Sequence, residues 1–137
     1  MNSFSIELIE DLNALLVRFE GKANKESLTF LYDQVLGHRS FQKHRNVIWK
    51  AANARISELG IEDFIPMLDY VLKTAERRGK SFTAWVFPDG EDYTRACAFK
   101  AASTDTGLIF PEIFTDLSEA MEWIGEKENQ RRSETSL

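Results

Sequence analysis

The stretch that decides the fold of this chain reads Ile113-Phe114-Thr115-Asp116-Leu117-Ser118-Glu119-Ala120-Met121-Glu122-Trp123-Ile124. It starts as the end of a strand. From Leu117 to Ile124 apolar residues fall at i, i+3, i+4 and i+7, which predicts a helix with one apolar stripe. Asp116 precedes the stripe and Glu119 follows three residues later, which is the spacing of a capping box. A strand that leads directly into a capped helix favours an α/β fold.

The same order of strand and helix recurs upstream. Apolar patterning predicts a hairpin of strands over 4–10 and 15–19, and later strands over 47–49, 81–87 and 108–114. Helices are predicted from Asn24 to Gly37, from Ile61 to Gly79 with Pro66 as a kink or a late start, from Glu91 to about Ala102, and from Leu117. The fold class is therefore α/β, with a mostly parallel five-stranded sheet and four helices. Pro111 marks its strand as an edge.

Length and composition favour a single soluble domain over residues 1–125. The chain has 137 residues, a net charge of −5 and one cysteine, Cys97. The net charge argues against a general nucleic-acid binder. Short apolar runs argue against membrane insertion, and a lone cysteine without a signal peptide indicates the cytoplasm. Residues 126–137 are polar and lack periodicity, which predicts a disordered tail.

Residues with catalytic or ligand-binding chemistry are few. His38 and His44 lack a nearby cysteine or carboxylate at ligand spacing, and we expect them to be solvated. Asp89 and Asp92 have the chemistry for a hard cation or for acid–base work, but helix capping explains both. There is no glycine-rich phosphate loop and no Ser-His-Asp order. The sequence therefore predicts no catalytic constellation, no metal site and no cofactor.

Four stretches resemble the SpoIIAA-like (STAS-like) superfamily, in particular bacterial members of uncharacterised function. They are Leu15–Gly21, Val47–Trp49, Ser81–Phe99 and, as the closest match, Phe114–Ile124 with its Glu-Ala-x-x-Trp-aliphatic helix. The resemblance covers about residues 4–125. It implies the fold of that superfamily, with an N-terminal hairpin and a variable loop after the buried strand.

The resemblance also implies a role in partner switching. Members with a known role bind a regulatory kinase or another protein, under control of a serine in an Asp-Ser-Ser-Gly-like motif. Here Ser57 is the only serine in the corresponding region, Ile56 replaces the aspartate, and the paired serine is missing. Two interpretations of Ser57 stay open, a regulatory phosphosite and a turn or capping residue, and the second is favoured.

Binding sites in open parallel sheets form beyond the carboxyl ends of the strands. That rim is expected over Lys50–Gly60, Pro88–Asp92 and Phe114–Asp116. Its candidate contact residues are Lys50, Asn53, Arg55, Ser57, Glu58, Asp89, Asp92, Thr115 and Asp116. A partner or a small ligand is expected to bind there.

Three functions are compatible with the sequence. In order of preference they are a non-catalytic module that binds another protein, a carrier of an apolar small molecule or lipid, and a small enzyme. A carrier requires a cavity lined by Phe64, Ile65, Leu68 and Trp85, and an enzyme requires Asp89 and Asp92 to meet a histidine. Homo-oligomerisation stays open.

Overall fold

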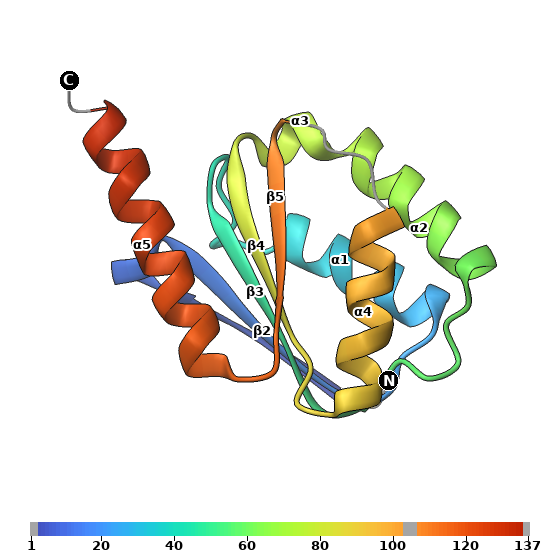
Figure 1. Ribbon diagram of the computed structural model, residues 1–137. Coiled ribbons are helices and arrows are strands. Elements are labelled where there is room, and N and C mark those ends of the chain that lie inside the picture. Colours follow the sequence, from blue (N-terminus) through green and yellow to red (C-terminus); the bar gives the residue numbers. More distant parts are fainter. Residues whose placement is uncertain (1–2, 103–106, 136–137) are drawn as a thin grey trace.

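The computed structural model describes residues 3–102 and 107–135 (Figure 1). Its strands are β1 (Ser3–Ile9), β2 (Ala14–Lys22), β3 (Asn46–Arg55), β4 (Ser81–Val86) and β5 (Ile109–Phe114). Its helices are α1 (Lys25–Leu36), α2 (Ile61–Lys73), α3 (Ala75–Arg78), α4 (Gly90–Ala102) and α5 (Leu117–Thr135), with a 3-10 turn, η1 (Glu10–Leu12), between β1 and β2.

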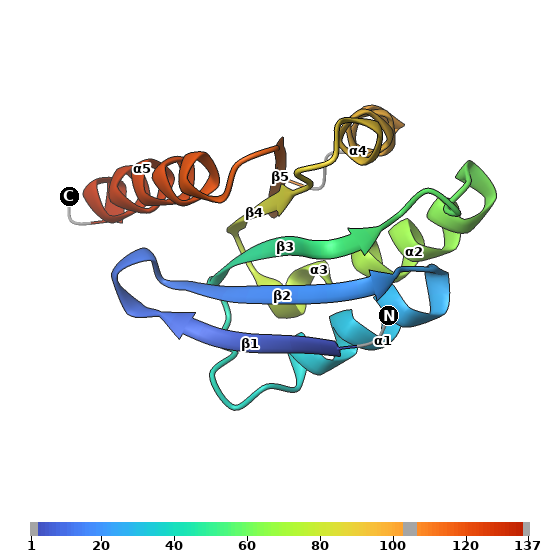
Figure 2. The ribbon, with the colours of Figure 1, turned by 90° about the horizontal axis from the view of Figure 1, so that it is seen from below.

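The five strands form one sheet in the order β1-β2-β3-β4-β5. β1 pairs antiparallel with β2, from Ser3 opposite Glu20 to Ile9 opposite Ala14, and every later pair is parallel. The α/β class, the N-terminal hairpin and the mostly parallel sheet are therefore confirmed. β5 is an edge strand, as Pro111 predicts, and β1 is the opposite edge (Figure 2).

Helices cover both faces of the sheet. Right-handed crossovers between strands added in sequential order place every connecting helix on the same face. Accordingly, α1, α2 and α4 lie on one face, and α5, which follows the last strand, lies on the other (Figure 1). Trp49 and Phe19 belong to the core under α1, and Ile48 and Val86 belong to the smaller core under α5. β3 and β4 both supply fully buried residues, among them Trp49 and Val86.

The structure has one helix more than the sequence predicts. A single helix is expected between Ile61 and Gly79, but it divides at Thr74 into α2 and α3. The Thr74 hydroxyl lies 3.1 Å from the carbonyl oxygens of both Tyr70 and Val71 and 3.2 Å from the Tyr32 hydroxyl. Such side-chain bonds compete with the helical ladder, so α2 ends there. α2 begins at Ile61 and contains Pro66, so the predicted late start is wrong.

The predicted loop over Lys50–Gly60 is wrong in its first half. β3 continues to Arg55 because β2 continues to pair with it, Gly21 opposite Ala54 and Lys22 opposite Arg55. The pairing register shifts beyond Phe19, and Asn53 lies in this region with φ of +55°. The alanine-rich sequence lacks the β-branched residues that signal a strand, so only the pairing reveals it.

The predicted disordered tail is also wrong within the described residues. α5 continues to Thr135, and residues 136–137 lie outside the described part of the chain. The helix is held by Glu128, which is 3 % exposed and accepts hydrogen bonds from Asn13 and Asn46. Arg131 pairs with Glu128 and donates to the carbonyl oxygens of His44 and Lys80. Polar contacts to distant residues thus replace the missing apolar periodicity.

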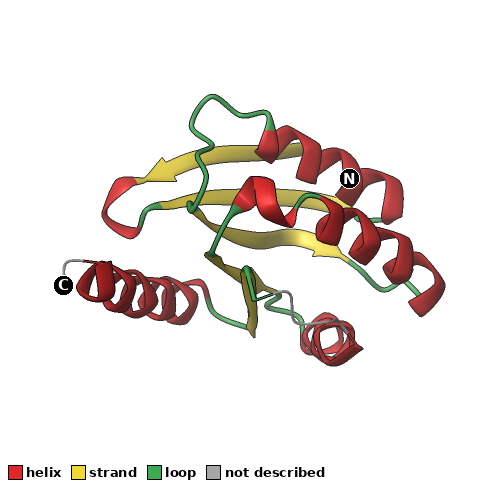
Figure 3. Ribbon diagram, turned by 90° about the horizontal axis from the view of Figure 1, so that it is seen from above, coloured by secondary structure: helices red, strands yellow, loops and turns green. Residues whose placement is uncertain are grey.

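Seen from above, α5 lies along the sheet apart from the other helices (Figure 3). Among the described residues, no helix combines the length and apolarity needed to cross a lipid bilayer.

Candidate functional site

The rim of the sheet, defined as the segments that follow the carboxyl ends of β3, β4 and β5, contains one dense polar cluster. Asp89 follows β4 and caps α4, because its Oδ1 accepts hydrogen bonds from the backbone N–H groups of Glu91 at 3.0 Å and Asp92 at 3.2 Å. The predicted capping role of Asp89 is confirmed. The cap orients the first turn of α4 so that its carboxylates face the end of β3.

Asp92 has a different role from the one predicted. It is 1 % exposed and is not a cap, since its oxygens accept hydrogen bonds from Arg55 Nε at 3.0 Å and from the Ile56 backbone N–H at 3.4 Å. Arg55 Nη2 lies 3.5 Å from carboxylate oxygens of both Asp89 and Glu91. The hydrogen bond to Asp92, followed by the charges of Asp92 and Asp89, raises the pKa of Arg55.

This cluster, which we call the Arg55 clasp (Arg55, Asp89, Glu91 and Asp92), has one guanidinium facing three carboxylates. The carboxylates are engaged by a fixed cation, and the clasp joins the end of β3 to the start of α4. Within residues 3–102 and 107–135, no three His, Cys, Asp or Glu side chains are grouped to hold a metal ion. The clasp therefore has the geometry of a set of ion pairs that stabilises the contact between β3 and α4.

The turn from Ile56 to Gly60 connects the clasp to α2. Leu59 donates a backbone hydrogen bond to the Ile56 carbonyl oxygen at 3.0 Å, and its own carbonyl accepts one from Arg95 Nη1 at 2.7 Å. Ser57 and Glu58 are exposed at the tip of the turn, where Glu58 pairs with Lys22 at 2.7 Å. The N-cap of α2 is Gly60. Of the roles considered for Ser57, a turn residue matches its position, and phosphorylation stays a prediction.

The other candidate rim residues lie away from the clasp. Lys50 is half-buried within β3, where burial and then the charge of Arg18 lower its pKa, and its Nζ donates to the Ala51 carbonyl oxygen at 2.8 Å. Thr115 and Asp116 follow β5, the neighbour of β4, and lead into α5 on the opposite face of the sheet from α4 (Figure 1). Asp116 caps α5, and hydrogen bonds from the Ser118 hydroxyl and from backbone N–H groups lower its pKa.

Asn53 is exposed on β3, two residues before Arg55. Its left-handed backbone conformation is tolerated by asparagine better than by most residues, because its short polar side chain bonds locally. The structure thus brings together Arg55, Asp89 and Asp92, keeps Asn53, Ser57 and Glu58 nearby along the chain, and gives Lys50 and Asp116 other hydrogen-bond partners.

The exposed apolar face of α2 was not predicted from the sequence. None of its residues is buried, whereas α1 buries five apolar or aromatic residues. Ile61 is 52 % exposed, Ile65 is 60 % exposed and Leu72 is 37 % exposed. The signal was present in the sequence, because Met67 and Tyr70 bring the apolar residues between Ile61 and Ala75 to nine, which is more than one side of a helix can turn to a core.

The histidines do not meet the carboxylates of the clasp. His38 follows α1, and its Nδ1 accepts a hydrogen bond from the Ser40 backbone N–H at 3.1 Å. His44 precedes β3, and its Nδ1 lies 3.3 Å from the Lys80 carbonyl oxygen. Both histidines lie near the amino ends of the parallel strands, and the clasp lies at the carboxyl ends. The meeting of acid and histidine that an enzyme requires is absent between these described residues.

The residues expected to line a carrier cavity pack differently. Phe64 stacks on Phe99 with ring centroids 4.6 Å apart, and Ile65 points to solvent. Trp85 stacks between Trp49 at 4.8 Å and Phe87 at 6.1 Å. These contacts fill the space beside α2 with paired rings, and they do not favour a cavity at this place.

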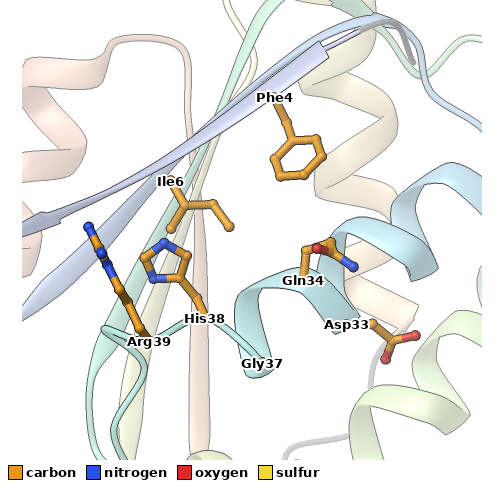
Figure 4. A pocket seen from close by; sticks show the side chains of 7 residues that line it. All are labelled: Phe4, Ile6, Asp33, Gln34, Gly37, His38 and Arg39. Carbon is orange, nitrogen blue, oxygen red and sulfur yellow. The ribbon is translucent and has the colours of Figure 1, made fainter.

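Two shallow pockets open on the α1 side of the molecule. The first, of about 420 Å³, lies between β1 and α1 (Figure 4) and is lined by Phe4, Ile6, Asp33, Gln34, Gly37, His38 and Arg39. The second, of about 620 Å³, lies between α1 and α2, and its apolar lining is Phe30, Pro66, Met67 and Tyr70. Neither includes a residue of the Arg55 clasp.

Comparison with protein-family models, with curated proteins and with solved structures found no match to this chain.

Proposed function

We propose that this chain is a non-catalytic module that binds another protein through α2, at the part of the rim that the Arg55 clasp holds. The observation that carries the proposal is the exposed apolar stripe of α2, made of Ile61, Ile65, Leu68 and Leu72. Three of these side chains are more than one third exposed, and Leu68 is half-buried. Contiguous apolar surface of this kind typically marks an interaction site.

The spacing of the stripe indicates the kind of partner. The four residues follow one another at intervals of four, three and four, which is the spacing of the seam between two packed helices. An amphipathic helix from a partner would fit its own apolar residues between them at a shallow crossing angle. We therefore infer a partner that presents an amphipathic helix.

The Arg55 clasp would act as a positioning element in this function. Ile61 directly follows the turn that Asp92 and Arg95 hold through Ile56 and Leu59. These bonds orient the start of α2 relative to β3 and α4, so the stripe is presented on a supported helix. Preorganisation of this kind reduces the entropy cost of association.

The resemblance to the SpoIIAA-like superfamily supports the same proposal. A parallel sheet in sequential strand order, opened by a hairpin, is compatible with that fold. The proposal includes a cytoplasmic location, in line with a single cysteine. Control by phosphorylation at Ser57 is the weaker extension. Ser57→Asp should alter partner affinity if the extension holds, and unchanged affinity would remove it.

The test uses affinity capture from the native host with the full chain and with the Ile65→Ser variant. Phe110→Ser, a substitution of a half-buried aromatic residue of β5 that contacts Phe82 on the α5 side of the sheet, is the matched control. A partner captured by the wild type and the control should bind Ile65→Ser about 5- to 20-fold more weakly in calorimetry. Ile65 is 60 % exposed in the free chain, and the variant loses the apolar surface that this part of the side chain would bury in the complex. Equal affinity for Ile65→Ser and the wild type would refute the α2 site.

A further inference from the structure

The two edges of the sheet differ in how they are protected. β5 contains Pro111, which lacks a backbone donor, and Glu112 on this strand pairs with Lys100 at 2.8 Å. β1 has seven residues, Ser-Phe-Ser-Ile-Glu-Leu-Ile, without proline or lysine, and within the described residues it pairs only with β2 (Figure 2). An open edge of this length presents free backbone donors and acceptors to an added strand.

Apolar side chains accompany the open edge. Phe4 is 38 % exposed and Phe30 of α1 is 50 % exposed, and the two rings meet edge to face with centroids 6.2 Å apart. Phe4 and Ile6 point from β1 toward α1, over the pocket that Asp33, His38 and Arg39 help to line (Figure 4). The edge therefore has two layers, a strand without a neighbour and a helix with an unburied aromatic ring.

We propose that this edge binds a second copy of the chain, with the two β1 strands antiparallel about a two-fold axis at Ile6. Ile6 is the centre of Ser3–Ile9, so this register pairs all seven residues. Phe4 then faces Leu8 of the other copy, and Ile6 faces itself. The interaction is independent of the α2 stripe.

The second copy is favoured over an unrelated strand because β1 is complementary to itself. Glu7 is the only charged residue of β1, and in this register it faces Ser5 of the other copy, so no like charges oppose. The same axis makes the two α1 helices antiparallel. Arg39, which follows α1, and Asp33 line the same pocket beside Ile6, so the axis brings groups of opposite charge from the two copies to the same side of the interface.

A charged residue at position 5 tests the register, because it would face a positive charge within its own sheet and a negative charge on the other copy. Within one copy Ser5 is opposite Arg18 of β2. Ser5→Glu therefore faces an arginine in its own sheet but Glu7 of the other copy, and should weaken the dimer without destabilising the monomer. Ser5→Lys faces a like charge in its own sheet and Glu7 across the axis, and should tighten the dimer. Two symmetric pairs change the dissociation constant by about 2- to 30-fold in each direction.

Sedimentation velocity of the full chain from about 1 to 300 µM measures the dissociation constant directly. The wild type should dimerise reversibly, Phe30→Ser should weaken the dimer, and Ser5→Glu combined with Glu7→Lys should restore it. Urea unfolding of each variant confirms that the monomer is folded.

Three results would overturn the inference. A wild type that stays monomeric over the whole range would leave the edge for a strand of another protein or without a partner. A dimer that responds equally to Ser5→Glu and Ser5→Lys would contradict the register. A dimer lost in Ile65→Ser and kept in Phe30→Ser would place the contact on α2. Failure of the α2 proposal leaves this one standing, because Ile65→Ser is expected to dimerise as the wild type does.

Discussion

Glu128→Ala tests why a polar segment folds as the second half of α5. Glu128 is buried and accepts hydrogen bonds from Asn13 Nδ2 at 3.0 Å and Asn46 Nδ2 at 3.4 Å, and it pairs with Arg131. Alanine is the better helix former, so intrinsic propensity predicts a small stabilisation. The tertiary contacts predict the opposite sign.

The expected loss in the free energy of unfolding is about 2–4 kcal/mol. Each hydrogen bond to the ionised Glu128 carboxylate would contribute about 1.5–3 kcal/mol on its own. The expected loss is smaller than the sum of three such contributions, because the donors keep other acceptors. Asn13 Nδ2 also reaches the His44 carbonyl oxygen at 3.3 Å, Asn46 Nδ2 reaches that of Leu12 at 3.1 Å, and Arg131 retains two carbonyl contacts.

Urea unfolding measures the stability, and trypsin cleavage at Arg131 and Arg132 reports whether the end of α5 has separated. Glu128→Gln keeps an acceptor and loses the charge, so its stability should lie between those of the wild type and Glu128→Ala. Glu126→Ala is the matched control, since Glu126 is exposed on the same helix. A Glu128→Ala protein within about 0.5 kcal/mol of the Glu126→Ala protein would refute the reasoning.

Three further outcomes are expected. Burial raises the pKa of Glu128, but hydrogen bonds from Arg131, Asn13 and Asn46 outweigh it, so the pKa is lowered. The ionised Glu128 therefore stabilises the fold fully above its unfolded pKa of about 4.3, and this stabilisation is lost as the pH falls. The difference in unfolding free energy between the wild type and Glu128→Ala should narrow in urea titrations below pH of about 4. Asp92→Ala should cost about 1–3 kcal/mol in urea unfolding, whereas Glu91→Gln, which changes an exposed contact of the same Arg55, should cost less than about 0.5 kcal/mol. Asn53→Val should cost about 1–2 kcal/mol and Asn53→Gly almost nothing in thermal unfolding, because only valine is strained at φ of +55°.

The rim shows which contacts can be predicted from local sequence patterns and which cannot. Asp89 was found from the sequence because a cap and its helix are adjacent in the chain. The partnership of Arg55 with Asp92 was not found, because it joins positions 37 residues apart. Capping was predicted for Asp92 because it is the closest local explanation for a carboxylate in a first helical turn.

The exposed side of α2 and the extension of β3 were missed for related reasons. Apolar periodicity identifies the helix over Ile61–Lys73 but not how many of its sides find a neighbour. In Lys50–Arg55, the strand depends on pairing with β2, whose end lies more than 25 positions earlier in the chain. A pairing of that kind leaves no period in the alanine-rich segment itself.

The sequence by itself determined the α/β class, the order of strands and helices, the hairpin, the caps at Asn24, Asp89 and Asp116, and the edge position of β5, because each follows from residues within a few positions of one another. The tertiary structure alone decided the Arg55 clasp, the burial of Glu128, the exposure of the α2 stripe and the open edge at β1. Each of these depends on which distant side chain or strand is placed alongside, and the free energy of such contacts comes from desolvation and pairing between remote parts of the chain.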